Sequence, residues 1–284
     1  KINTNVAALT AQEANANTNK ALQASLEKLS SGLRINKASD DASGLSIADK
    51  LRTQASSIGQ SISNANAGVS LVQIADKAMA EESNILDIIK TKLLQAATAT
   101  TSTAGADAIA KDINKLLEQI DNIASQTNYN GISLLQTSST STSTTTGLTF
   151  QVGESASDEI TTSGDIQANV TGMGLTSLKG MASNGGGSLT AANASSFLDE
   201  IDTALNSLNT WRSDFGSTQN QLESATRNMM TQQTNIKAAE SVIRDVDYAQ
   251  ESANFNKQNI ISQAGTYALS QANQVSQNVL RLLQ

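Results

Sequence analysis

Two stretches of the chain, one in each half, carry a coiled-coil repeat that constrains the fold more than any other feature. In the first half, apolar residues alternate at spacings of four and three, which places them on one face of a helix. In the second half, large apolar residues recur every seven residues. The two stripes are Leu51, Ala55, Ile58, Ile62, Ala65, Val69 and Val72, and then Phe215, Leu222, Met229, Ile236 and Ile243, with Thr218, Ala225, Gln232, Ala239 and Val246 at the second repeat position. The pattern predicts that the beginning of the chain pairs with its end.

Breaks in the stripes predict where the helices end. Gly32 and the polar run 36–41 interrupt a first stripe that extends from Ile2 to Leu33, and an Asp in that run is suited to cap the next helix. We expect further helices over 43–97, through 109–123, over 196–243 and over 248–283, with a loop at 98–106 and a turn at Asn130-Gly131. The apolar face of the helix through 109–123 consists of Ile109, Ile113, Leu116, Ile120 and Ile123. Helices of this length favour a bundle or coiled coil.

The middle of the chain has a different character. Ser138 to Thr146 is almost pure Ser and Thr, which predicts a solvated loop. Leu148, Phe150 and Val152 alternate with polar residues, which is strand periodicity, and the partner strand lies at either 159–162 or 166–170. The predicted fold is therefore mainly α: a long helical bundle or coiled coil formed by paired N- and C-terminal arms, with a small β-hairpin region near 148–170.

The chain lacks the residues that most catalytic and metal sites need. It contains no histidine and no cysteine, which removes the usual general base and the commonest zinc ligands. We interpret Asp40-Asp41 and the pair Asp245 and Asp247 as helix caps rather than catalytic carboxylates. A net charge of −7 with scattered basic residues argues against nucleic acid as a partner, and no run approaches the roughly 18 apolar residues of a membrane span. We expect no enzymatic activity, cofactor or metal.

Several motifs carry a resemblance to a known family. They are Leu29-Ser30-Ser31-Gly32-Leu33-Arg34-Ile35-Asn36, Asp40-Asp41-Ala42-Ser43-Gly44-Leu45, Ser125-Gln126-Thr127-Asn128-Tyr129-Asn130-Gly131, Ser270-Gln271-Ala272-Asn273 and the ending Asn278-Val279-Leu280-Arg281-Leu282-Leu283-Gln284. In combination they resemble the bacterial flagellins over about 1–178 and 197–284. Larger flagellins insert outer domains where this chain has only 179–195, so it looks like a minimal member. Some flagellins carry a metallopeptidase in that insert, which needs histidines that this chain lacks.

The resemblance implies a domain organisation and a function. It predicts an inner core domain of 1–40 plus 247–284, a rod-like helical domain of 41–178 plus 196–246, and a short variable exposed insert at 179–195. The expected function is that of a structural subunit of the bacterial flagellar filament, which self-assembles into a helical tube for swimming. The alternative is the hook-filament junction protein, which has similar ends.

The outermost stripes have no third partner within one chain, so we predict that they are buried against neighbouring subunits. The residues of this inter-subunit core are Leu22, Leu26, Leu29, Leu33, Ile260, Ala264, Val275, Val279 and Leu282. By resemblance, the terminal arms are disordered before assembly, and the partners are further copies of the chain, an export chaperone on the C-terminal arm, the filament cap and the hook-filament junction proteins. The type III flagellar apparatus would export the chain unfolded to an extracellular filament.

One helical segment bears on recognition by hosts. In enteric-type flagellins the segment that Toll-like receptor 5 reads contains an Arg-x-Arg-Glu-Leu pattern, and the matching stretch here is Lys90-Thr91-Lys92-Leu93-Leu94. Lysine lacks the planar fork of arginine, so we expect weakened receptor binding, as in the Campylobacter-like flagellins that this stretch resembles. The alternative is that the lysines only line a subunit interface. The receptor-recognition residues are Lys90, Lys92, Leu94 and Asp112.

The Ser/Thr-rich segment is a candidate for modification. By resemblance to some relatives, it is expected to carry O-linked glycans, and the alternative is a bare solvated loop. The candidate acceptors are Ser138, Ser139, Ser141 and Ser143.

Overall fold

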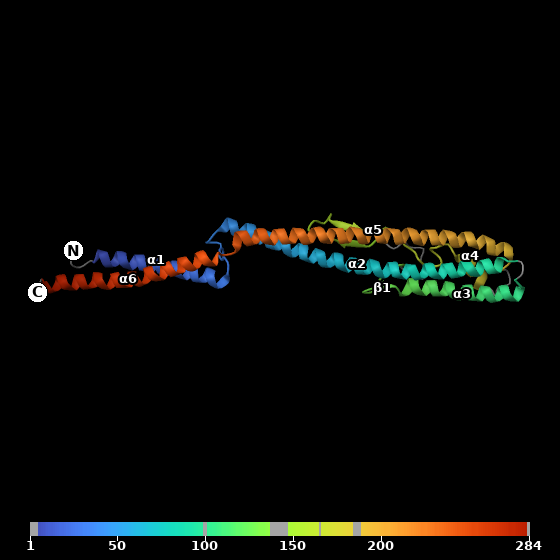
Figure 1. Cartoon of the computed structure of the whole chain (residues 1–284), viewed down its shortest axis with the longest axis horizontal. Coiled ribbons are helices and arrows are strands. Elements are labelled where there is room, and N and C mark those ends of the chain that lie inside the picture. Colours follow the sequence, from blue (N-terminus) through green and yellow to red (C-terminus); the bar gives the residue numbers. More distant parts are fainter. Residues whose placement is uncertain (1–4, 99–100, 137–146, 165, 184–188, 283–284) are drawn as a thin grey trace. The chain divides into compact units, whose positions relative to one another are not determined.

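The computed structural model describes residues 5–98, 101–136, 147–164, 166–183 and 189–282, and for 276–282 it describes the backbone alone. In chain order the elements are α1 (Val6–Ser31), α2 (Ala42–Ala97), α3 (Thr103–Gln126), β1 (Asn128–Tyr129), β2 (Ile132–Ser133), β3 (Thr149–Gln151), β4 (Glu159–Thr161), α4 (Thr176–Ser183), α5 (Ala191–Arg244) and α6 (Tyr248–Leu282) (Figure 1). The mainly helical fold with small antiparallel hairpins is the predicted one.

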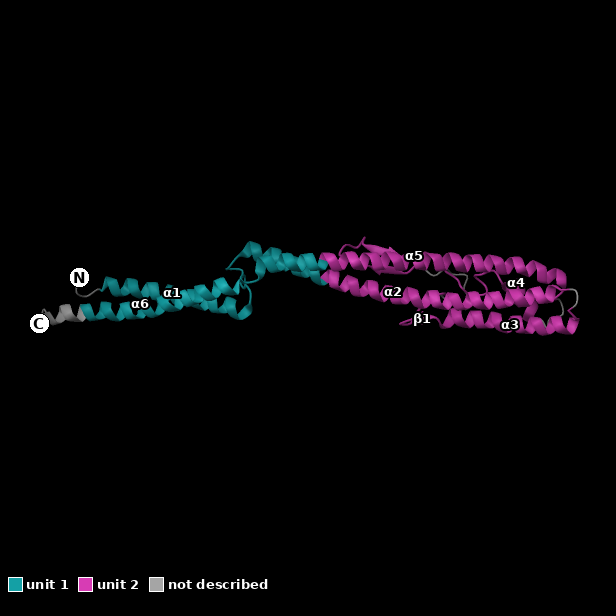
Figure 2. Cartoon of the chain, viewed as in Figure 1, with its two compact units in different colours: residues 1–56, 233–284 teal, residues 57–232 magenta. Residues whose placement is uncertain are grey.

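The chain divides into two compact units (Figure 2). Unit 1 contains residues 1–56 and 233–284, and unit 2 contains residues 57–232. In unit 1, α1 lies alongside α6. In unit 2, ion pairs join α2 to α5 through Asp76 and Arg212, 2.9 Å apart, and α2 to α3 through Lys92 and Asp112, 2.8 Å apart. The beginning and the end of the chain therefore meet in unit 1, as the stripes predicted.

Polar caps set the helix boundaries close to the predicted positions. The Asn5 side chain accepts a hydrogen bond from the Ala8 N–H at the start of α1, and Gly32 ends α1 with φ +74°. The Asp41 carboxylate accepts from the Gly44 N–H at the start of α2, and Asp247 accepts from the Ala249 and Gln250 N–H groups at the start of α6. Each cap satisfies N–H groups that have no partner within the helix. These two aspartates therefore act as caps.

The repeat on α2 is buried in unit 2, but its phase differs from the prediction. Ile62 and Val69 are only partly buried, whereas their neighbours Ser61 and Gly68 are buried. The prediction chose the larger residue at each ambiguous position, but the phase of the repeat decides burial. The buried face, called the α2 seam below, consists of Ile58, Ser61, Ala65, Gly68, Val72, Ala75, Met79, Glu82, Leu86, Ile89, Leu93 and Ala96.

The seven-residue repeat on α5 is buried only as far as Met229. Thr226 rather than Ala225 fills the second repeat position, Gln232 and Ala239 are exposed, and Ile236 and Ile243 are partly buried. The prediction of one continuous seam from Phe215 to Val246 was therefore wrong in its second half. The buried repeat runs instead toward the start of the helix and consists of Ala194, Ile201, Leu208, Phe215, Leu222 and Met229.

On α3, Leu117 and Ala124 are buried where Leu116 and Ile123 were predicted. This helix is the most strongly amphipathic of the long helices. Its buried face continues the spacing of Ala106, Ile109 and Ile113. As on α2, the predicted residue is one position away from the one that faces the core.

Two hairpins complete unit 2. The turn at Asn130-Gly131 has φ values of 51° and 82°, which suit a tight turn between β1 and β2. β3 pairs with β4 so that Phe150 faces Ile160, which confirms 159–162 as the partner strand and excludes 166–170. Residues 166–170 instead form a buried loop, in which the Ala168 N–H donates to the Leu135 carbonyl.

The range 179–195 is not wholly exposed. It contains the end of α4 and the start of α5, and Ala182, Leu189 and Ala194 are buried within its described part. α4 packs on α3, and Lys179 pairs with Asp121 of that helix. The segment expected to project outward thus contributes to the core of unit 2.

Replacing glycine with alanine is expected to have opposite effects on stability at two helical positions, Gly68 and Gly216. A Cβ at Gly68 would lie 2.8 Å from the Phe150 ring, whereas a Cβ at Gly216 of α5 would meet nothing within 4 Å. Alanine is favoured over glycine in a helix by about 1 kcal/mol, and overpacking costs about 1–3 kcal/mol. Gly216→Ala should raise the free energy of unfolding and Gly68→Ala should lower it, as measured by urea unfolding. Equal gains would contradict the packing of β3 on α2.

Candidate self-association surface

Polar contacts join α1 to α6. The Asn5 amide donates to the Ala272 carbonyl at 3.0 Å, and the Ser262 hydroxyl donates to the Asn19 side-chain oxygen at 3.0 Å. Near the other end of the pair, the Ser25 hydroxyl donates to the Glu251 carboxylate. The early residues of α1 thus face the late residues of α6, and the two helices run antiparallel with polar side chains along the seam between them.

Several large apolar side chains of the same helices point away from that seam, whereas Leu22, Leu29, Phe255 and Leu269 are partly buried. On α1, Leu26 is 55% exposed, and on α6, Ile260 and Tyr267 are 67% and 75% exposed. The only fully buried residue described in α1 is Ser25. Long apolar side chains arranged in this way along a helix pair mark a surface for association. We call this surface the outer face; it consists of Val6, Leu9, Leu26, Ile260, Ile261, Tyr267 and Val275.

The predicted inter-subunit residues fall into three groups. Leu26, Ile260, Ala264 and Val275 are exposed in the single chain. Leu22, Leu29 and Leu33 are partly buried, and Val279 and Leu282 lie where only the backbone of α6 is described.

Four residues of the outer face lie on the predicted outermost stripes, 2–33 and 260–282, but are absent from the list of inter-subunit residues: Val6, Leu9, Ile261 and Tyr267. A signal for Tyr267 was present, because it follows Ile260 by seven residues.

Backbone hydrogen bonds join the end of α1 to the segment between α5 and α6. The Arg34 N–H donates to the Arg244 carbonyl at 2.7 Å, and the Val246 N–H donates to the Gly32 carbonyl at 3.0 Å. The Arg34 guanidinium also donates to the Ile243 carbonyl. We call residues 32–34 and 244–246 the linker bridge. The bridge gives a structural role to the Ser31-Gly32-Leu33-Arg34 motif, because that motif ties the α1 end to the segment between α5 and α6.

The loop after the linker bridge is ordered by one carboxylate. Asp40 accepts hydrogen bonds from the Asn36 and Lys37 N–H groups at 3.0 and 2.9 Å. The backbone hydrogen bond from Lys37 first, and that from Asn36 next, lower the pKa of Asp40. The carboxylate therefore stays ionised at neutral pH and holds the turn that leads into α2.

The receptor-recognition residues lie in unit 2. Lys90 pairs with Asp202 of α5, Lys92 pairs with Asp112 of α3, and the Leu94 side chain is exposed. Leu93, which stands where the enteric pattern has Glu, is completely buried in the α2 seam. Both cationic groups are thus committed to ion pairs within the chain. The glycosylation candidates Ser138, Ser139, Ser141 and Ser143 lie outside the described residues.

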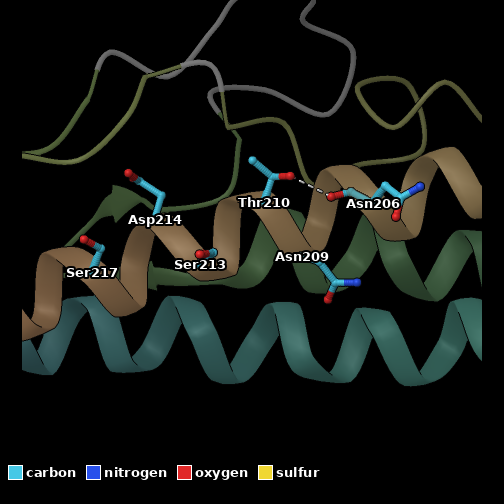
Figure 3. A pocket seen from close by; sticks show the side chains of 6 residues that line it. All are labelled: Asn206, Asn209, Thr210, Ser213, Asp214 and Ser217. Atoms are coloured by element: carbon cyan, nitrogen blue, oxygen red, sulfur yellow. Dashed lines mark hydrogen bonds between the residues drawn. The ribbon is translucent and has the colours of Figure 1, made fainter.

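A shallow polar groove on α5 offers hydrogen-bonding groups but no basic side chain (Figure 3). The Thr210 hydroxyl donates to the Asn206 carbonyl, and Asp214 accepts from the Ser163 N–H at 2.9 Å. The lining residues are Asn206, Asn209, Thr210, Ser213, Asp214 and Ser217. Nothing in this set supplies a nucleophile paired with a base.

Among the described residues, no cluster of three or more Asp, Glu, His or Cys side chains is placed to hold a metal ion. No described helix has the length and apolar character that crossing a bilayer requires.

Gly32 tests the linker bridge. Its φ of +74° costs a non-glycine residue about 1–2 kcal/mol, and an added Cβ would lie 2.8 Å from the Tyr248 hydroxyl oxygen. Gly32→Ala should therefore speed hydrogen exchange of the Arg34 and Val246 amides by roughly tenfold. The added variant Tyr248→Phe should recover part of the loss.

The matched control is Gly180→Ala, because a Cβ there would meet nothing within 4 Å. It should leave both amides unchanged. Exchange in Gly32→Ala at the wild-type rate would show that the bridge does not depend on this glycine.

Comparisons with known proteins agree with these features. The model of the bacterial flagellin N-terminal helical region matches residues 2–140, and that of the C-terminal helical region matches residues 198–283. Flagellin of Bacillus subtilis (strain 168) is 36% identical over 310 residues, covering 100% of this chain and 99% of that protein. The flagellar filament 33 kDa core protein of Treponema phagedenis is 35% identical over 290 residues, covering 99% of each.

A crystal structure of Bacillus cereus flagellin is 29% identical, covers 63% of this chain and 94% of that chain, and has a TM-score of 0.48. The full-length similarity to filament proteins does not favour the hook-filament junction protein. The chain belongs to the bacterial flagellin family, a family of structural proteins rather than enzymes, and is a structural subunit of the flagellar filament.

Proposed function

We propose that copies of this chain join in the filament core by burying the outer face of α1 and α6 against neighbouring copies. The observation that carries the proposal is the arrangement of unit 1, in which Ser25 is buried against Glu251 while Leu26 and Ile260 point outward. Repeated association through surfaces that do not close on themselves produces a filament. The full set of interface residues is the predicted inter-subunit core together with the outer face.

The energy available from this surface is sufficient for assembly. Complete burial of a Leu or Ile side chain contributes about 1.5–3 kcal/mol, and the outer face holds several such side chains in each copy. In the single chain the same groups contribute little to folding, because they remain in water. The α1–α6 pair is thus expected to order fully only on assembly, which supports the prediction that the terminal arms are disordered before it.

The proposed domain organisation places α1 and α6 in the filament core and most of α2 to α5 in the rod. We assign 1–40 plus 247–284 to the inner core domain, 41–178 plus 196–246 to the rod-like domain, and 179–195 to a short variable insert. The division of the chain near residues 56 and 233 supports a split between terminal and central parts. The linker bridge lies at the proposed boundary.

As a filament component the chain functions outside the cell. We propose that it leaves through the flagellar type III apparatus, with a chaperone covering α6, and that the filament cap and hook-filament junction proteins contact it during assembly. The exposure of Ile260, Tyr267 and Val275 supports the chaperone, since an unprotected apolar helix would associate before export.

Matched substitutions on the outer face test the proposed assembly. Leu26→Gln with Ile260→Gln keeps helix-forming residues but removes apolar surface, and the loss of about 2 kcal/mol per side chain predicts a critical concentration for polymerisation at least tenfold higher. The control pair, Leu26→Met with Ile260→Met, preserves the apolar surface and should polymerise like the wild type. Light scattering and sedimentation measure both. Polymerisation of the Gln pair at the wild-type concentration would refute the assigned interface.

We also propose weakened recognition by Toll-like receptor 5. The ion pairs of Lys90 and Lys92 within the chain and the burial of Leu93 support it, because neither the planar guanidinium groups nor the acidic group of the enteric pattern is presented. Purified monomer should show low potency in a receptor reporter assay. Lys90→Arg with Lys92→Arg should raise the potency, and the exposed control Lys77→Arg should not. Full potency of the wild-type monomer would overturn the proposal.

A further inference from the structure

One acidic side chain lies inside the α2 seam. Glu82 is 0% exposed, and neither of its carboxylate oxygens has a hydrogen-bond partner. It occupies a position of the repeat between the buried Met79 and Leu86, where an apolar residue would ordinarily pack. A carboxyl group without partners is expensive to bury when it is charged and much less so when it carries its proton.

Among the described residues no cation pairs with Glu82, and Lys77 of α2 and Lys111 and Lys115 of α3 have exposed side chains. Asp121 of α3 opposes the ionisation of Glu82, and Asp121 itself is occupied by Lys179 of α4 and the Val170 N–H. Along this part of α2, Asp76 and Lys90 pair with Arg212 and Asp202 of α5. These pairs lie about two helical turns before and after Glu82. On α2 itself, the neighbouring Glu81 is exposed and accepts from Asn84.

Burial first, and the Asp121 charge second, raise the pKa of Glu82 to about 9. In the unfolded chain the group titrates near 4.5. The folded state therefore holds one more proton than the unfolded state between these two values. The stability linked to this group is fully present below the unfolded pKa and is lost as the pH rises toward the folded pKa.

We propose that Glu82 is a proton-dependent lock on unit 2, in which the neutral carboxyl packs in the α2 seam and loss of its proton to solvent loosens the packing of α2. Unit 2 then holds together most firmly in mild acid and opens more readily in alkali. This behaviour is opposite to that of hydrogen-bonded surface carboxylates such as Asp40, whose ionised form belongs to the folded state. The lock acts within one chain, so it does not require the proposed assembly interface.

Unfolding of the full-length monomer at two pH values tests the lock. From pH 5 to pH 8, the linkage from Glu82 alone raises the unfolding equilibrium constant by roughly 700-fold, given the folded and unfolded pKa values. Glu82→Gln has nearly the same shape and does not titrate, so its unfolding constant should lack this change. The exposed neighbour variant Glu81→Gln should keep it. Urea titrations monitored by circular dichroism give the ratio of the unfolding constants at pH 8 and pH 5 for the wild type and the two variants.

Several outcomes decide the proposal. A larger rise in the unfolding constant for the wild type and Glu81→Gln than for Glu82→Gln supports it. The same pH dependence in the wild type and Glu82→Gln overturns it. If Glu82→Gln does not fold, Glu82→Met replaces it, since an apolar side chain fits the seam. Glu82→Met should show a smaller rise in the unfolding constant from pH 5 to pH 8 than the wild type and Glu81→Gln, and retention of the full wild-type pH dependence by Glu82→Met refutes the lock.

Discussion

The structure depends on how α1 and α6 pair. Polar side chains such as Ser25 and Glu251 contribute to the contacts between the two helices, and large apolar side chains such as Leu26 and Ile260 point outward. Hydrogen bonds between partly exposed groups contribute only about 0.5–1.5 kcal/mol each, so this pair is weakly held in a single chain. In the proposed assembly, burial of Leu26, Ile260 and Tyr267 by other copies supplies what the single chain lacks. We therefore propose that these terminal helices form a surface for polymerisation rather than a core.

Unit 2 has the opposite arrangement. The α2 seam and the repeat on α5 bury large side chains such as Met79, Leu86 and Phe215 completely, and the ion pairs between helices lie at the margins. Such a unit folds on its own contacts. Glu82 is a costly feature of this unit, and we propose that it ties the stability of unit 2 to pH. The chain therefore combines a self-sufficient part with a part that needs neighbours, as a filament subunit requires.

Much of this arrangement could be predicted from the sequence. Seven-residue spacing predicted the long helices, Gly32 and Asp247 marked helix ends, and Asn130-Gly131 marked a turn. The phase of the α2 seam could not be predicted, because Ile62 and Val69 have the larger apolar surface but the repeat turns Ser61 and Gly68 inward. Local periodicity does not show which side of an apolar stripe faces the core.

The candidate surface was predicted in outline only. Its leucines were identified from the absence of a third partner, but the polar seam that turns Leu26 outward follows from side chains more than 200 positions apart, such as Ser25 and Glu251. The burial of Glu82 could not be predicted from the sequence either, because it depends on the surrounding helices rather than on the neighbours of Glu82 in sequence. Contacts between distant segments decide both features.

Hydrogen–deuterium exchange on the monomer and on the polymer tests most directly whether α1 and α6 form an assembly surface. In the monomer, the amides of α1 and α6 should exchange within seconds to minutes, while those of α2 around Met79 and of α5 around Phe215 stay protected. In the polymer, α1 and α6 should gain strong protection around Leu26 and Ile260. Protection of α1 and α6 that is already complete in the monomer, or absent in the polymer, would contradict the assignment of these helices to an assembly surface.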